Sequence, residues 1–136
     1  MIARAKLGLA AAMMGATGLA SGCDPDLPGG GRRLDSARYT VVYRTVPDRI
    51  QLGQHFAVEL AVCANPGAPM PENVGVDAWM PEHRHGMNYK ASITRGAAAR
   101  FRADGLLFHM PGRWELLFDL RAAGRTDRVT RSEVFE

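Results

Sequence analysis

Apolar and polar residues alternate along most of the chain after residue 38, as they do in β-strands with one buried face. The clearest case is the segment 114–121, where every second residue from Trp114 to Leu120 is large and apolar. Seven segments have this period or a strand-like composition: Tyr39–Val46, His55–Val62, Val74–Met80, Tyr89–Thr94, Ala99–Phe108, Arg113–Ala122 and Arg128–Phe135. The pattern predicts an all-β domain.

Turn-forming residues separate these segments. Pro, Gly, Asn and Asp recur between them at short intervals, and no segment after the first 22 residues keeps a helical period. About seven short strands with a tryptophan on a core face are typical of an immunoglobulin-like antiparallel β-sandwich. A small cupredoxin-like barrel is the alternative architecture.

The first 22 residues have the features of an export signal. Arg4 and Lys6 precede an apolar run from Leu7 to Ala20, and small residues then lead to Cys23. The run is short and rich in Ala and Gly, which favours a cleaved secretory peptide over a membrane span. The residues before Cys23 resemble a bacterial lipobox, which implies that this cysteine is lipidated. We therefore expect a membrane-anchored lipoprotein that faces the periplasm or the outside of the cytoplasmic membrane.

Composition divides the exported chain into a tether, residues 23–37, and a folded domain, residues 38–136. The tether contains prolines, three consecutive glycines and several charges, but few side chains that a core would bury. If Cys23 carries lipid, Cys63 has no intramolecular disulfide partner. Cys63 is then a buried unreactive residue, a thiolate ligand or part of an intermolecular disulfide.

Charge and motifs exclude two large classes of function. Two of the 17 basic residues lie in the predicted signal, so the exported chain is nearly neutral, and its arginines are dispersed. The chain also lacks a nucleophile elbow, a phosphate-binding glycine loop outside the tether, and paired carboxylates for acid–base chemistry. We expect neither a nucleic-acid-binding protein nor an enzyme.

The candidate chemistry lies in two short segments, 79–87 and 109–114, which each contain a Met-Pro step and a tryptophan. Together they hold three of the four histidines and three of the seven methionines. Imidazole suits copper, zinc and nickel, and a thioether adds a preference for monovalent copper. The sequence therefore predicts a copper site, with Cu(I) as the expected ion and five candidate ligands: His83, His85, Met87, His109 and Met110.

Other interpretations of the same residues remain open. Zinc would accept three imidazole nitrogens and the Glu82 carboxylate. Met80 and Met110 would also serve as flexible apolar side chains that fill the open end of a sandwich. The two histidines of the first segment would then face solvent on a turn. The fourth histidine, His55, is expected on the surface.

These two segments, extended to 76–87 and 105–116, resemble the YtkA-like domain family, and the resemblance spans roughly Arg38 to Ala122. The matching motifs are Met80-Pro81 with His85-Gly86, and Met110-Pro111-Gly112 with Trp114. The resemblance implies a small immunoglobulin-like domain outside the cytoplasmic membrane, often lipid-anchored, similar to domains found beside copper-handling and respiratory-oxidase assembly proteins. The ligand roles of His83 and His109 rest on local chemistry and not on the resemblance.

Two functions from different classes fit these observations. In the first, a domain anchored through Cys23 binds copper and holds it or delivers it to a respiratory or other metalloprotein. In the second, a metal-free immunoglobulin-like module docks onto a membrane complex and assists its assembly. The two Met-Pro loops would then be a protein contact surface, for which flexible methionines are well suited.

Overall fold

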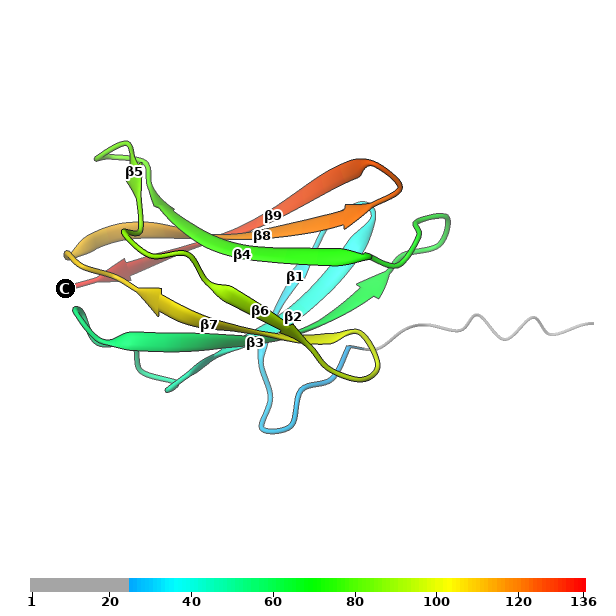
Figure 1. Ribbon diagram of the computed structural model, residues 1–136, viewed down its shortest axis with the longest axis horizontal. Coiled ribbons are helices and arrows are strands. Elements are labelled where there is room, and N and C mark those ends of the chain that lie inside the picture. Colours follow the sequence, from blue (N-terminus) through cyan, green and yellow to red (C-terminus); the bar gives the residue numbers. More distant parts are fainter. Residues whose placement is uncertain (1–24) are drawn as a thin grey trace, which may run out of the picture.

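The computed structural model describes residues 25–136, which form two β-sheets (Figure 1). The first sheet contains, in spatial order, β1 (Arg32–Asp35), β2 (Tyr39–Val46), β3 (His55–Ala64), β7 (Arg100–Leu107) and β6 (Ser92–Arg95). The second contains β5 (His85–Gly86), β4 (Asn73–Met80), β8 (Gly112–Ala122) and β9 (Arg125–Phe135). Neighbouring strands are antiparallel throughout both sheets.

The two sheets pack face to face, so the prediction of an all-β antiparallel sandwich is confirmed. Residues 25–136 contain nine strands, whereas the sequence pattern predicts about seven. The two additional strands, β1 and β5, have four and two residues. Segments of that length are too short to show a period. No helix that is long and apolar enough to cross a membrane occurs in this part of the chain.

Alternation along the strands determines where the core lies. In β4 the side chains alternate between buried and more exposed positions from Val74 to Met80. In β8 every second side chain from Trp114 to Leu120 is fully buried. Complete burial of one such side chain stabilises the fold by about 1.5–3 kcal/mol. These rows, which meet the inward-facing side chains of β2, β3 and β7, hold the two sheets together.

The segment before β2 corrects the predicted domain boundary. Residues 32–35, which were expected in the flexible tether, form the edge strand β1 on β2. Leu27 is only 4% exposed and packs against Val42 and Ala61 on the outer side of the first sheet. The Arg100 guanidinium also donates to the carbonyl oxygen of Asp26. The folded domain therefore begins before residue 38. The predicted signal peptide, residues 1–22, and Cys23 lie outside the described residues.

Cys63 lies near the end of β3 and is 2% exposed. It is disulfide-bonded, which does not agree with its interpretation as a thiolate ligand. Its low exposure agrees with the interpretation of a buried cysteine near a strand end.

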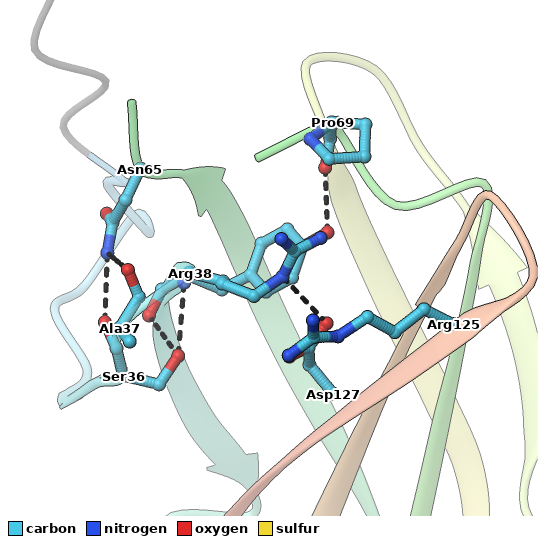
Figure 2. Close-up of polar contacts among 8 residues, drawn as sticks. Ser36, Ala37, Arg38, Asn65, Pro69, Arg125 and Asp127 are labelled. Atoms are coloured by element: carbon cyan, nitrogen blue, oxygen red, sulfur yellow. Dashed lines mark hydrogen bonds and ion pairs between the residues drawn. The ribbon is translucent and has the colours of Figure 1, made fainter. Parts of the chain in front are cut away.

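Polar contacts close the end of the sandwich from which β2 and β4 start (Figure 2). The Asp127 carboxylate accepts hydrogen bonds from Arg38 at 3.1 Å and Arg125 at 3.0 Å. The Asn65 side-chain amide donates to the Ser36 carbonyl oxygen at 2.9 Å. Because Arg38 precedes β2 and Asp127 lies in β9, the Arg38–Asp127 contact joins the two sheets. The candidate ligands lie at the opposite end.

Candidate metal centre

The two predicted segments meet at one end of the sandwich. The β4–β5 hairpin carries His83 and His85, and the connection between β7 and β8 carries His109. Both connections lie at the same end of the molecule in Figure 1. The antiparallel topology causes this arrangement, because β4 ends where β8 begins and where β7 ends.

A tight turn positions the first two histidines. The Met80 carbonyl oxygen accepts hydrogen bonds from the backbone N–H groups of His83 and Arg84, at 3.3 and 2.9 Å. Arg84 has φ 55°, the left-handed conformation that lets the chain reverse within the turn. The chain then returns as β5, in which His85 pairs with Met80. The hairpin therefore fixes His83 in the turn and His85 on a paired strand.

Two hydrogen bonds hold the connection that carries His109. The Trp114 indole N–H donates to the Met110 carbonyl oxygen at 3.0 Å. On the other side of His109, the Phe108 carbonyl oxygen accepts a hydrogen bond of 2.8 Å from the backbone N–H of Gly53. The backbone is thus anchored on both sides of His109, while the His109 side chain is exposed.

The structure brings the three predicted histidines together in a row. The ring centroids of His83 and His85 are 5.8 Å apart, and those of His85 and His109 are 5.1 Å apart. Two imidazoles that share a metal ion through bonds of about 2 Å have ring centroids roughly 5–6 Å apart. The spacing of each neighbouring pair is therefore compatible with a shared metal ion.

A buried tryptophan forms the base of this row. The Trp114 ring meets His85 and His109 edge to face, at centroid distances of 6.1 and 5.4 Å. On its inner side it stacks on Phe108 at 4.6 Å, and Phe108 in turn contacts Phe56. The histidine cluster, defined here as His83, His85 and His109, therefore rests directly on the aromatic part of the core.

One hydrogen bond determines which nitrogen of His85 can bind a metal. The Nδ1 atom of His85 lies 3.0 Å from the carbonyl oxygen of Gly86. Because a carbonyl oxygen only accepts hydrogen bonds, this contact requires the proton on Nδ1, and in the neutral imidazole Nε2 then holds the free electron pair. This is the usual arrangement of a metal-binding histidine, whose second nitrogen donates to a carbonyl or carboxylate.

The cluster is a row of side chains and not a closed cage. Within residues 25–136, no group of three His, Cys, Asp or Glu side chains is already arranged as a metal site. His85 is half-buried, whereas His83 and His109 are exposed. Exposed side chains change rotamer within picoseconds to nanoseconds. The two outer rings are therefore free to turn toward an ion at Nε2 of His85.

The methionines are placed differently from the histidines. Met80 is fully buried, in agreement with its interpretation as an apolar plug at the end of the sandwich. Met87 and Met110, the two predicted thioether ligands, are partly buried and pack against the core. Of the five predicted ligands, the structure thus brings the three imidazoles together, whereas the two methionines are partly buried against the core.

Two other candidate residues have partners of their own. The Glu82 carboxylate, considered above as a zinc ligand, forms an ion pair of 3.2 Å with Arg113. His55 is exposed, as expected, and its ring contacts Tyr89 with the centroids 5.0 Å apart. The role of Arg113 was not predicted. Its position next to Trp114 in an alternating strand indicates only that it points away from the core.

No family model and no curated protein matches the sequence, so membership of the YtkA-like family stays a prediction. Among solved structures, the chain is similar to a DUF4426 family protein from Pseudomonas aeruginosa, with a TM-score of 0.52 and 8% sequence identity. The similarity covers 76% of this chain and 96% of that protein. At this identity the likeness concerns the fold alone, and it agrees with a small all-β domain.

Proposed function

We propose that this protein is an exported copper-binding domain, in which the histidine cluster holds the ion at one end of the β-sandwich. The observation that supports the proposal most directly is the row of His83, His85 and His109. These residues come from two connections that are well separated in sequence. Imidazole is a good copper ligand, and copper binds more tightly than other first-row divalent metals to a given site of this kind.

The position of the cluster favours holding and transfer of the ion over catalysis. His83 and His109 are exposed, so a partner's ligands can reach an ion bound there and replace the imidazoles one at a time. The base of the site is rigid, because Trp114 is fully buried and stacked on Phe108. The proposed recipient is a respiratory or other metalloprotein outside the cytoplasm.

The test is a copper titration of the purified protein against a competing chromophoric chelator, with both Cu(I) under anaerobic conditions and Cu(II). We expect one copper ion per chain and a loss of binding in the double variant His83→Ala/His85→Ala. His55→Ala is the matched control, since it removes an exposed histidine that contacts Tyr89. No binding of either ion by the native protein would exclude this function.

A second candidate, an interaction module that assists assembly of a membrane complex, has an observation of its own in its favour. Trp79 and Tyr89 are 40% and 47% exposed, although large aromatic side chains are usually buried. Trp79 pairs with Gly86 of β5, which follows His85 directly in the chain. A photoreactive residue at position 79 tests this alternative, which predicts metal-independent cross-links to one membrane protein.

Export and anchoring are separate parts of the proposal. A disulfide at Cys63 supports export, because disulfides persist in oxidising compartments and are rare in the cytosol. A sulfur atom cannot carry a lipid thioether and a disulfide at once, and the chain has two cysteines, Cys23 and Cys63. The intact mass of the exported protein, measured before and after reduction, distinguishes lipidation of Cys23 from an intramolecular disulfide. A lipid mass adduct supports anchoring through Cys23, whereas a gain of two hydrogens on reduction supports an intramolecular disulfide.

A further inference from the structure

We propose that the histidine cluster is selective for copper(II) and binds it through imidazole nitrogens alone. Water or a donor from a partner protein would fill the remaining positions. This inference rests on the proposed function and specifies the form of copper involved. It departs from the sequence-based expectation of Cu(I), which depends on thioether ligands.

The first argument concerns the methionine sulfurs. Met80 is fully buried, and its terminal methyl group lies so close to Gly112 that a Cβ added there would be 2.9 Å away. Met87 and Met110 both pack against the core. Complete burial of a methionine side chain is worth about 1.5–3 kcal/mol. Turning the thioether of Met87 or Met110 outward to bind an ion would lose the part of this stabilisation that the partly buried side chain contributes.

The second argument concerns the other soft or charged donors. Cys63 is disulfide-bonded and buried in β3, so it provides no thiolate. The Glu82 carboxylate is held by the Arg113 guanidinium at 3.2 Å, and that positive charge opposes a second cation nearby. The donors that remain are the three neutral imidazoles of the cluster. Nitrogen and oxygen donors in a tetragonal arrangement suit copper(II), whereas copper(I) is selected by thiolates and thioethers.

The third argument concerns the geometry around His85. Its Nε2 atom is the free donor, because Nδ1 donates to the Gly86 carbonyl oxygen. His83 and His109 both neighbour His85, at centroid distances of 5.8 and 5.1 Å. An ion at Nε2 of His85 would thus have two further imidazoles nearby, and both of these side chains are exposed. Zinc would accept the same nitrogens, but for a given site copper(II) binds more tightly than zinc.

The experiment uses Trp114 as a reporter inside the purified protein. The chain has two tryptophans, so the variant Trp79→Phe leaves Trp114 as the sole one. Because the Trp114 ring touches His85 and His109, bound copper(II) is expected to quench its fluorescence with a one-to-one endpoint, and excess zinc is expected not to reverse the quenching. Electron paramagnetic resonance of the same sample should show nitrogen ligands. Cu(I) affinity is measured in parallel with an anaerobic chelator competition.

Matched variants distinguish the imidazole donors from the thioether donors. In the Trp79→Phe background, His85→Ala should weaken copper(II) binding by more than roughly 10–100-fold, which is the typical cost of losing the outer hydrogen-bond partner of a ligand. Met87→Leu and Met110→Leu should leave the copper(II) affinity unchanged, and so should the control His55→Ala. Circular dichroism and thermal unfolding establish that each variant is folded. Because leucine preserves apolar packing, the methionine variants test the sulfur atom and not the fold.

The outcomes distinguish this inference from the function on which it rests. Tighter binding of Cu(I) than of copper(II), together with weaker binding in either methionine variant, would overturn the inference and leave a copper-binding function intact. Displacement of copper(II) by equimolar zinc would also overturn it. Absence of binding for both forms of copper would overturn the inference and the proposed function together.

Discussion

The indole N–H of Trp114 donates a 3.0 Å hydrogen bond to the carbonyl oxygen of Met110, which connects the hydrophobic core to the loop that carries His109. The same indole ring is fully buried and meets His85 and His109 edge to face. One side chain therefore links the stability of the sandwich to the arrangement of the histidine cluster. A change at Trp114 should affect both properties.

The variant Trp114→Phe keeps an aromatic ring in the core but removes the N–H donor. The Met110 carbonyl oxygen then loses its partner, which costs about 1–3 kcal/mol when the group stays buried. We expect the free energy of unfolding in urea to fall by about that amount, and copper binding to weaken because the His109 loop is no longer fixed. Trp79→Phe, at an exposed position, should change stability by less than about 0.5 kcal/mol. Equal stability of the two variants would contradict this account.

Gly112, at the start of β8, is constrained by both conformation and space. Its φ is 125°, and a Cβ at this position would be 2.9 Å from the terminal methyl of Met80. Gly112→Ala should therefore destabilise the protein by more than Gly124→Ala. Gly124 also has a positive φ of 72°, but no atom lies within 4 Å of its added Cβ. Thermal unfolding of the pair measures the combined cost of the Met80 contact and of the φ at Gly112, relative to about 1 kcal/mol for alanine in the left-handed region. Equal destabilisation would show that Met80 moves aside and that the φ of Gly112 adds no further cost.

Most of the fold follows from the sequence, because its strands are long enough to show their period. Trp114 to Leu120 is an example, since its alternation predicts the buried face that the structure has. The segment around Leu27 is the counterexample. A single apolar residue among glycines and prolines carries no period, yet Leu27 is buried by Val42 and Ala61 from strands that are remote in sequence. Local pattern cannot reveal a contact that depends on where the sheet places its outer face.

The candidate site was predictable in composition but not in geometry. The residue types and the two Met-Pro steps indicate which loops to examine, and His83, His85 and His109 do lie together. The distinction between imidazoles and thioethers is not visible in the sequence. It depends on which side chains pack inward, and Met110 packs on the core next to an exposed His109. Arg113, the partner of Glu82, lies on β8 and is remote in sequence from the β4–β5 turn that carries Glu82, so no local signal reveals the pair.

An ion pair across the second sheet should make stability depend on pH in acid. Asp119 and Arg128 are register partners on β8 and β9, and the guanidinium donates to both carboxylate oxygens at 2.7 and 2.9 Å. The hydrogen bond from Arg128, with smaller contributions from its charge and that of Arg121, lowers the pKa of Asp119 below its usual value. A carboxylate with a lowered pKa in the folded state stabilises the protein fully above the unfolded value of about 3.9. That contribution is lost as the pH falls through the lower folded pKa.

We therefore expect Asp119→Asn to lower the free energy of unfolding at neutral pH by about 1 kcal/mol, the upper range for partly exposed pairs. The difference from the native protein should shrink as the pH falls below about 4. Urea titrations at several pH values between neutral and acid measure it. Asp104→Asn is the control, because Asp104 pairs with Arg102 at a more exposed position and should have a smaller effect at every pH. A difference that does not change with pH would mean that Asp119 acts through packing and not through its charge.

Gly86 provides a test of whether the hairpin geometry itself determines metal binding. A Cβ at Gly86 would be 3.2 Å from the Ala78 carbonyl oxygen, so alanine at this position should push β5 away from β4 and displace His85. We expect Gly86→Ala to weaken copper binding at least tenfold, on the order of the loss seen when the outer hydrogen bond of a ligand is removed, while the protein remains folded. Gly96→Ala is the matched control. Its Cβ would be 3.4 Å from the Arg100 carbonyl oxygen, in a turn of the other sheet that contributes no histidine. If both variants bind copper as tightly as the native protein, the position of His85 on β5 is not what creates the site.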